Sequence, residues 1–186
     1  MSTQIVRKLF TVAEYHKMIE VEVLREDDRL ELLGGEIVAM SPIGSRHAAC
    51  VSRLTHLLIE RLGRRAIVNV QNPVQLDEES EPQPDLSLLK PRPDFYSAAH
   101  PKPSDIYLLV EVADTTAAYD RRVKLPFYAK AGIPEVWLID LEAEKIEVYR
   151  EPSAQGYRQM QTVERGQSLR IQAFPDVELK ANEILG

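Results

Sequence analysis

Long hydrophobic runs are missing from this chain of 186 residues. No stretch approaches the roughly 18 consecutive apolar residues that predict a transmembrane helix. The amino-terminal MSTQIVRKLF also lacks the apolar core of a signal peptide. Cys50 is the only cysteine in the sequence. A single cysteine cannot form an intramolecular disulfide. These absences together favour a cytosolic protein that does not contact a membrane.

An excess of positive charge is missing as well. The 29 acidic residues outnumber the 23 basic ones, and the formal net charge is −6. This balance weakens nonspecific attraction to a polyanion and argues against a protein that coats DNA by charge alone. A local basic face can still coexist with an acidic total. The candidates for such a basic rim are Arg46, Arg53, Arg61, Arg64 and Arg65.

Several patterns of known catalytic and metal sites do not occur. The chain has no glycine-rich phosphate loop and no G-x-S-x-G nucleophile elbow. His16, His56 and His100 show no metal-ligand spacing, and one cysteine cannot build a zinc site. P-loop and serine-hydrolase chemistry are therefore without local support.

Local patterns in the amino-terminal third predict two helices and a hairpin. Thr11, followed by Glu14, forms a capping box that predicts a short helix. A Gly-Gly pair between two short apolar runs predicts a hairpin over residues 29–40. Helical spacing predicts a helix over residues 45–63, with Ser45 as its N-cap. Its apolar stripe is Cys50, Val51, Leu54, Leu57, Leu58 and Leu62.

The rest of the chain is rich in predicted strands. A helix is predicted over residues 120–131, with Val123, Phe127 and Ala131 on its apolar stripe and Gly132 at its end. The predicted strands are residues 66–76 with an interruption at Pro73, then 85–89, 105–112 and 135–140, and finally a hairpin of 145–150 with 157–163.

This order of elements predicts an α/β or α+β protein with one central sheet. The strands over 105–112 and 135–140 flank a helix, so we expect them to be parallel neighbours joined by a right-handed crossover. No internal repeat and no linker divides the chain, so we expect one domain over residues 1–186.

Two carboxylates border strongly apolar strands. Glu111 interrupts the run YLLVEV, and Asp85 opens DLSLL. An ionised carboxylate costs several kcal/mol to bury without a partner. If the two strands are adjacent, the acids converge, and their oxygens suit Mg²⁺ or Mn²⁺. Lys124 follows Asp120 by one helical turn and can point back toward the strand end.

Each of these residues also has a purely structural interpretation. Glu111 could pair with Lys124 or Arg122 as a salt bridge, and Asp85 could be a turn residue after Pro84. Lys124 could be a solvated helix residue. Asp120 fits a helix N-cap, and His47 fits the packed stripe of its helix.

The chain resembles the Uma2 family, also known as DUF820, of the PD-(D/E)XK nuclease superfamily. The resemblance is carried by PD at 84–85, EVADTT at 111–116, YAKAGIPEVWLID at 128–140 and LELLGGEIVAMSPIGSRHAACVSRL at 30–54. It spans roughly residues 10 to 150. It implies a restriction-endonuclease-like α/β core, with a mixed central sheet flanked by helices and with amino- and carboxy-terminal β-hairpins.

The resemblance also implies roles for single residues. It makes Asp85 and Glu111 metal ligands. Ala113 stands where the superfamily has its strand lysine, and the resemblance assigns that role to Lys124. It further implies that Glu36 and His47 face the site, with Glu31 as an additional candidate.

The resulting hypothesis is a Mg²⁺- or Mn²⁺-dependent endonuclease that hydrolyses nucleic acid, with DNA as the expected substrate. Asp85, Glu111 and the Val112 carbonyl would hold the ion, and Lys124 would assist the reaction. Glu36, His47 and Asp120 would be accessory groups. Cleavage of both strands favours a homodimer. The alternative is a non-catalytic module that keeps the fold and binds nucleic acid or a protein.

Overall fold

The computed structural model of the chain describes residues 6–25 and 27–186, which form ten strands and five α-helices with short 3₁₀ and π turns. The helices are α1 (Val12–Glu20), α2 (Ser45–Leu62), α3 (Ala117–Tyr119), α4 (Leu125–Lys130) and α5 (Ala181–Leu185). The strands are β1 (Leu30–Leu33), β2 (Glu36–Ala39), β3 (Ile67–Val70), β4 (Leu86–Leu89), β5 (Ile106–Ala113), β6 (Glu135–Asp140), β7 (Lys145–Ser153), β8 (Gly156–Glu164), β9 (Ser168–Ile171) and β10 (Phe174–Lys180). None of the helices in the described part of the chain has the length and apolar character to cross a membrane.

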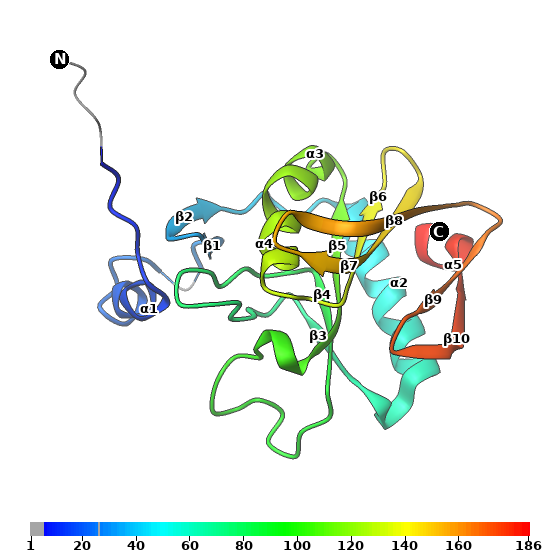
Figure 1. Cartoon of the computed structure of the whole chain (residues 1–186), viewed down its shortest axis with the longest axis horizontal. Helices are drawn as coiled ribbons and strands as arrows, with labels where there is room; N and C mark the ends of the chain where they lie inside the picture. Colours follow the sequence, from blue (N-terminus) through cyan, green and yellow to red (C-terminus); the bar gives the residue numbers. More distant parts are fainter. Residues whose placement is uncertain (1–5, 26) are drawn as a thin grey trace.

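Six strands form a mixed central sheet in the order β3-β4-β5-β6-β7-β8 (Figure 1). β5 and β6 are parallel, and every other neighbouring pair is antiparallel. The predicted parallel pairing of residues 105–112 with 135–140 is therefore confirmed. The predicted adjacency of the strands that begin near Asp85 and Asp105 is confirmed too, because β4 pairs with β5.

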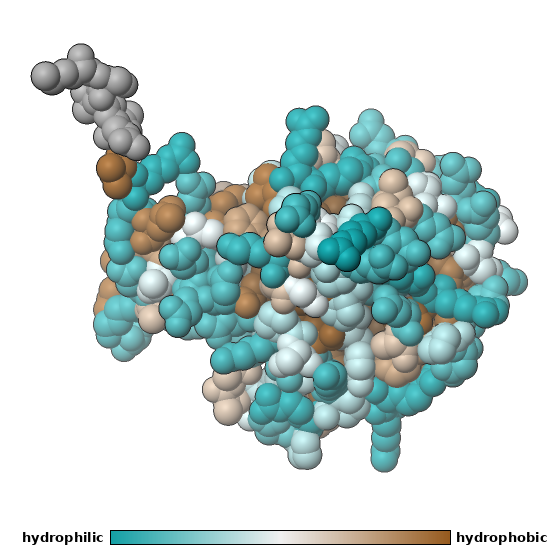
Figure 2. Space-filling model, viewed as in Figure 1, coloured by the Kyte–Doolittle hydropathy of each residue, from teal (hydrophilic) through white to brown (hydrophobic). Residues whose placement is uncertain are grey.

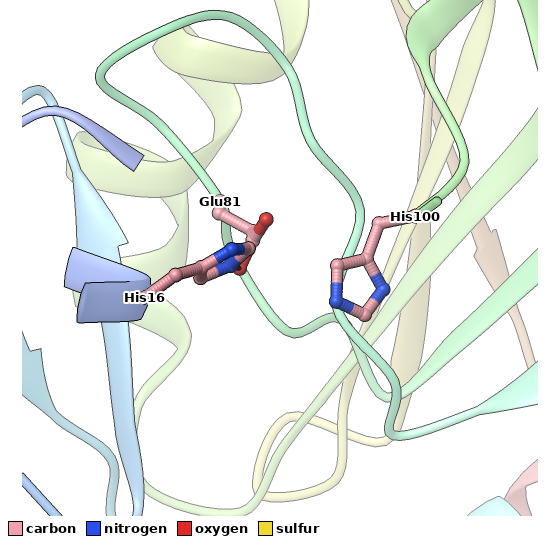
Figure 3. A group of neighbouring side chains, drawn as sticks. All are labelled: His16, Glu81 and His100. Atoms are coloured by element: carbon pink, nitrogen blue, oxygen red, sulfur yellow. Dashed lines mark hydrogen bonds and ion pairs between the residues drawn. The ribbon is translucent and has the colours of Figure 1, made fainter. Parts of the chain in front are cut away.

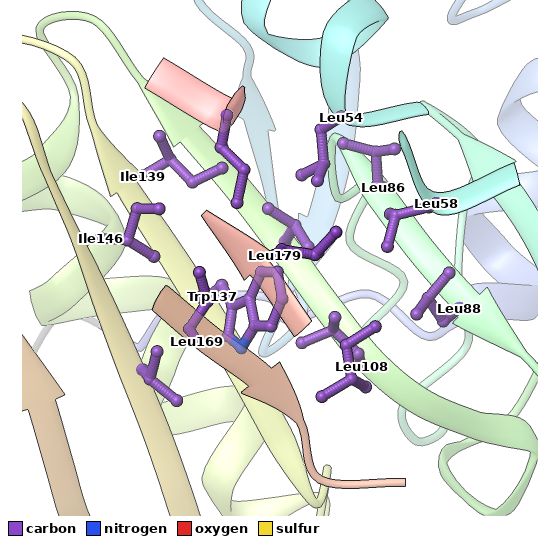
Figure 4. Packing of buried hydrophobic residues seen from close by; sticks show 14 of the residues in the cluster. Leu54, Leu58, Leu86, Leu88, Leu108, Trp137, Ile139, Ile146, Leu169 and Leu179 are labelled. Atoms are coloured by element: carbon purple, nitrogen blue, oxygen red, sulfur yellow. The ribbon is translucent and has the colours of Figure 1, made fainter. Parts of the chain in front are cut away.

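Helices cover both faces of this sheet. One apolar cluster joins α2, α5, β9 and β10 to the side chains of β5 and β6 that include Leu108, Val110 and Trp137 (Figure 4). A second cluster packs Leu125 and Tyr128 of α4 against the opposite face. Both faces of β5 and β6 are thus buried, which explains why these strands read as continuous apolar runs.

Two hairpins differ in their relation to the sheet. β1 and β2 form a separate antiparallel pair near the amino terminus, as the sequence predicts. The predicted hairpin over 145–163 exists, but β7 and β8 extend the central sheet instead of flanking it. A third hairpin, β9 with β10, also forms a separate antiparallel pair. No strand is predicted from the sequence for this part of the chain.

The crossover helix corrects two predictions. Asp120 is not an N-cap: Thr116 holds that position, and Asp120 begins a π-helical turn over Asp120–Lys124 that joins α3 to α4. The predicted stripe of Val123, Phe127 and Ala131 is only half-buried, whereas the buried face carries Asp120, Lys124 and Tyr128. The buried face mixes these polar groups with the apolar Leu125 and Ala129, so the apolar stripe read from the sequence lies one position away from it.

The start of α2 and the end of β3 also differ from the predicted positions. The N-cap of α2 is Gly44, and Ser45 is the first helical residue. The strand predicted over 66–76 ends at Val70, because its partner β4 begins at Leu86, opposite Val70.

The predicted basic rim around α2 is mostly engaged with the carboxy-terminal segment. Arg53 donates to the carbonyl oxygens of residues 184 and 185, Arg61 pairs with Glu183, and Arg65 pairs with Asp176. Arg46 pairs with Asp114. These contacts hold α2 against β10, α5 and the end of β5, while the side chains of Arg46, Arg61 and Arg65 stay partly exposed.

A buried ionic network on β7 predicts a loss of stability in acid. Burial alone would raise the pKa of Glu147, but hydrogen bonds from Arg121, Tyr149 and Lys145 outweigh it and hold the pKa at about 2. A carboxylate with a lowered pKa stabilises the fold above its unfolded pKa and loses that contribution as the pH falls toward 2.

We therefore expect the difference in unfolding free energy between wild type and Glu147→Gln to be on the order of 2 kcal/mol at pH 7 and to shrink below about pH 4.5. Denaturant titrations from pH 7 to pH 3 measure it, with Glu151→Gln, exposed on the same strand, as the control. A difference that stays constant over this range would contradict the assignment.

Candidate active site

A cavity of about 580 Å³ opens at the end of the sheet where β5 finishes and β4 starts. Its walls come from the hairpin of β1 and β2, the first turn of α2, and the segment from residue 114 to 124. Below, the acidic cavity denotes this space. Its ionisable lining includes Glu31, His47, Asp85, Glu111, Asp120 and Lys124.

Strand register places the two predicted ligands side by side. Leu86 on β4 faces Val110 on β5, so the next position along brings Asp85 opposite Glu111. Opposite residues of an antiparallel pair project to the same side of the sheet. Asp85 is tied to β5 directly, because the Val112 backbone N–H donates to its Oδ2 at 2.8 Å. Sheet pairing thus produces the convergence of the two acids that the sequence predicts.

Glu111 sits on the face of β5 that the crossover helix covers. Lys124 Nζ donates to Glu111 Oε1 at 3.2 Å, and the Tyr128 hydroxyl donates to the same oxygen at 2.5 Å. Lys124 Nζ also lies 3.1 Å from Oε2 of Glu31 on β1. The π turn ends at Lys124, and the helix that follows β5 thereby returns a cation to the end of that strand.

The charges in the acidic cavity are not balanced. Burial raises the pKa of Glu111 well above its ordinary value. The positive charge of Lys124 opposes this effect, while Asp120, Asp85 and Glu31 add to it through like-charge repulsion. Five carboxyl groups and two basic side chains, Arg29 and Lys124, line the cavity, so negative groups are in excess there.

The two hydrogen-bond donors to Glu111 remain protonated. Burial alone lowers the pKa of Lys124, but the negative charges of Glu111 and Glu31 outweigh it and raise the pKa above its ordinary value. Burial, followed by the charge of Glu111, raises the pKa of the Tyr128 hydroxyl. Lys124 is therefore a fixed positive charge near the cavity and not a proton acceptor at neutral pH.

His47 and Asp120 complete the lining from opposite walls. His47 Nε2 on α2 lies 2.9 Å from Asp85 Oδ1, and its Nδ1 is buried without a hydrogen-bond partner among the described residues. Asp120 accepts a hydrogen bond from Thr116 Oγ1 at 3.0 Å. Burial raises the pKa of Asp120. Both residues line the acidic cavity, as the sequence predicts.

Glu36 is a correction, because the structure does not bring it to the acidic cavity. It lies beside the turn of the hairpin and pairs with Arg7 on the surface at 2.6 Å. The cavity is instead lined by the open end of the hairpin, where Glu31 on β1 faces Val38 on β2. Two residues on one hairpin thus have different surroundings, because only one end of the hairpin reaches the sheet.

The donor set fits a hard divalent cation. Both hydrogen bonds to Glu111 reach Oε1, so Oε2 is the oxygen available to an ion, and Asp85 supplies a carboxylate from the adjacent strand. Carboxylate oxygens are the ligands that Mg²⁺ prefers in proteins, and water completes its coordination. The excess of carboxyl groups over cations gives such an ion an electrostatic reason to bind.

Sequence reasoning missed some of the contacts that build the site. Tyr128 is not among the predicted site residues, although its position four residues after Lys124 places both on one helical face. Gln71 donates to Asp85 Oδ1 at 3.2 Å, and the Gln83 backbone N–H donates to Glu31 Oε2 at 3.2 Å. No pattern in the sequence distinguishes these two glutamines, because both act from irregular segments.

Comparison with known proteins identifies a family and a similar solved fold. The family model named Uma2, described as "Putative restriction endonuclease", matches residues 12–182. A crystal structure described as a "putative nuclease belonging to DUF820" from Anabaena variabilis is similar over 95% of this chain and 97% of that chain. The TM-score is 0.73 and the sequence identity is 18%, so this likeness shows the fold. The comparison with curated proteins finds no match.

Proposed function

The chain belongs to the Uma2 family, described as putative restriction endonucleases, and from this premise we propose that it hydrolyses phosphodiester bonds of nucleic acid at the acidic cavity. The observation that supports the proposal best is the convergence of Asp85, Glu111 and Lys124 at one strand end. DNA is the proposed substrate, and Mg²⁺ or Mn²⁺ the proposed cofactor.

In the proposed mechanism Asp85, Glu111 and the Val112 carbonyl would hold the ion. A bound divalent cation supplies charge that polarises a phosphoryl oxygen and lowers the pKa of a water molecule. Glu31 and Tyr128 position Lys124 and Glu111 through the contacts described above. Lys124 provides fixed positive charge beside the phosphate, where negative charge grows as the water oxygen bonds to phosphorus and the phosphorus–oxygen ester bond breaks.

The first test is cleavage by the purified chain. Plasmid, linear duplex and single-stranded DNA are incubated with increasing Mg²⁺ or Mn²⁺, for wild type, Glu111→Gln and Glu36→Gln. We expect cleavage that needs the ion, is lost in Glu111→Gln, and persists in Glu36→Gln, because Glu36 lies outside the acidic cavity. If wild type cleaves no substrate with either ion, the chain is a non-catalytic module that binds nucleic acid or protein.

Metal binding also predicts a change in stability that needs no substrate. An ion that binds only the folded state stabilises it by about 2.7 kcal/mol at one hundred times its dissociation constant. We expect Mg²⁺ or Mn²⁺ to raise the melting temperature of wild type and of Glu36→Gln. The shift should be absent in Asp85→Asn, which removes one negative ligand. Equal shifts in all three proteins would place the ion elsewhere.

Cleavage of both strands of a duplex requires two active sites or two binding events, so we also propose that the chain forms a homodimer. We propose the cytosol as its location. Light scattering of the purified chain in the presence of duplex DNA measures the stoichiometry. A monomer that introduces only nicks would contradict the homodimer without contradicting the hydrolytic activity.

A further inference from the structure

A second group of ligand-type side chains lies outside the acidic cavity. His16 on α1, Glu81 on the loop before β4, and His100 on the loop before β5 come together from three distant segments (Figure 3). We call these three residues the histidine cluster. Its ligand atoms, one from each residue, all lie within 4.8 Å of one another. The sequence showed no metal-ligand spacing for these histidines, because long loops separate them.

The contacts within the histidine cluster are those of a site that a metal ion could occupy. His16 Nε2 lies 2.7 Å from Glu81 Oε1, in hydrogen-bond contact. The rings of His16 and His100 meet edge to face, with their centroids 6.0 Å apart. Two imidazole nitrogens and a carboxylate oxygen therefore surround one small volume.

Glu81 provides an independent observation that points to a ligand. Its side chain is buried, and its Oε2 has no hydrogen-bond partner among the described residues. A buried carboxylate oxygen without a partner is costly. The two histidines are exposed and border a hollow of about 780 Å³, so an ion and water can reach the carboxylate from that side.

We propose that the histidine cluster binds one transition-metal ion of the Zn²⁺ class, separate from the hard cation of the acidic cavity. Zn²⁺ binds imidazole nitrogen and carboxylate oxygen at about 2.0–2.2 Å, and water can fill its fourth position. Ligand atoms around a tetrahedral ion lie roughly 3.4 Å apart, so the contact between His16 and Glu81 widens and His100 moves inward by side-chain rotation.

The two sites differ in the ligands that they offer. The histidine cluster has two imidazoles, which favour Zn²⁺ and related ions, whereas the acidic cavity offers mainly carboxylate oxygens. Mg²⁺ prefers oxygen ligands and gives up its bound water reluctantly. Excess Mg²⁺ should therefore fill the acidic cavity and leave the histidine cluster to Zn²⁺.

The proposed ion would attach residues 6–25, which include α1 and are called the amino-terminal unit below, to the loops that border the sheet. α1 touches the loop before β4 through the Val12 backbone N–H, which donates to the Glu78 carbonyl at 2.7 Å. The same loop pairs with the hairpin of β1 and β2, since Leu32 and Glu81 exchange backbone hydrogen bonds. That hairpin carries Glu31 into the acidic cavity, so the ion would stabilise a wall of the proposed active site.

The test is Zn²⁺ binding by the full chain, prepared without a histidine tag and in excess Mg²⁺. Calorimetry or equilibrium dialysis is applied to wild type, His16→Ala and His100→Ala. The matched controls are His56→Ala, whose histidine is exposed on α2, and Asp85→Asn in the acidic cavity. Both cluster histidines are exposed, so their replacement should preserve the fold.

We expect wild type, His56→Ala and Asp85→Asn to bind one equivalent of Zn²⁺. His16→Ala and His100→Ala should bind it at least about 100-fold more weakly, because each loses a direct ligand. Zn²⁺ should raise the melting temperature of wild type and not that of His16→Ala. The proposal is overturned if wild type binds no Zn²⁺ at one site, if both cluster variants bind it as wild type does, or if Asp85→Asn alone abolishes binding.

Discussion

Replacing Lys124 by methionine is expected to lower the single-turnover rate of nucleic-acid cleavage by on the order of 10²–10³, because one fixed charge near the phosphate is removed. Methionine keeps the length of the buried stem while removing the ammonium group. Since lysine supplies no ligand to Mg²⁺, metal-induced stabilisation should persist in this variant. The loss should thus appear in the chemical step and not in binding of the ion.

Because Lys124 is buried in an ionic cluster, the stability of Lys124→Met must be measured together with its cleavage rate. The Lys124 side chain is only 6% exposed and pairs with both Glu31 and Glu111, so its removal leaves two acids facing each other. Glu111 can relieve this repulsion by keeping a proton, because burial already raises its pKa. Melting curves with and without Mg²⁺ separate lost stability from lost catalysis.

Two further variants sharpen the interpretation of Lys124. Lys124→Arg should restore little activity, since the planar guanidinium has a different shape and cannot fit between Glu31 and Glu111 as an ammonium does. Lys130→Met is the matched control, because Lys130 is exposed at the end of the same helix. If Lys124→Met cleaves at the wild-type rate while Glu111→Gln is inactive, Lys124 has no part in the reaction.

Replacing Arg150 by methionine should destabilise the fold strongly, because Arg150 neutralises a buried carboxylate. Glu135 is fully buried, and Arg150 on β7 donates to its Oε1 at 2.6 and 2.9 Å. Trp137 Nε1 donates to the same oxygen at 3.0 Å, and the Gln172 backbone N–H donates to Oε2 at 2.7 Å. This carboxylate therefore joins β6, β7 and the turn between β9 and β10.

Without Arg150 the buried charge of Glu135 loses its partner, and we expect a loss of about 3 kcal/mol in unfolding free energy. For a chain of this size that corresponds to a fall in melting temperature on the order of 10 °C. Arg158→Met, on exposed β8, is the control. The double variant Glu135→Gln/Arg150→Met should be more stable than Arg150→Met alone, because no unpaired charge is buried. Equal stability of the two single arginine variants would contradict the role of this pair.

The face in Figure 2 is largely hydrophilic, with apolar side chains visible beside the amino-terminal unit. Val6, Leu9, Val21 and Val23 of that unit are exposed. His16 belongs to the same part of the chain, so these exposed side chains lie close in sequence to the proposed Zn²⁺ site.

Local sequence patterns determined those elements whose signal lies within one segment. The capping box of Thr11 and Glu14 forms as predicted, and the Gly-Gly turn closes the hairpin of β1 and β2. The apolar stripe of α2 is buried along most of its length. The strands around Leu108 and Trp137 were recognisable because both of their faces are buried. Propensity, capping and periodicity act over a few residues, so one sequence suffices to read them.

The sequence also located the carboxylates of the acidic cavity, because an acid at the end of an apolar strand is anomalous by itself. Asp85 and Glu111 were identified in this way, with the family resemblance assigning Lys124. The pattern could not separate Glu31 from Glu36, which alternate along one short hairpin. Docking of the open end of that hairpin against the sheet decided that Glu31 enters the cavity and Glu36 stays on the surface.

Only the tertiary structure decided which distant residues meet. The buried face of the crossover helix carries Asp120, Lys124 and Tyr128 beside apolar residues, and a pattern of apolar residues alone does not show that polar side chains belong to it. The histidine cluster is the clearest case, since 65 residues separate His16 from Glu81. Such meetings depend on strand register, on the path of irregular loops and on how α1 docks. These are interactions between segments, and no spacing within any one segment encodes them.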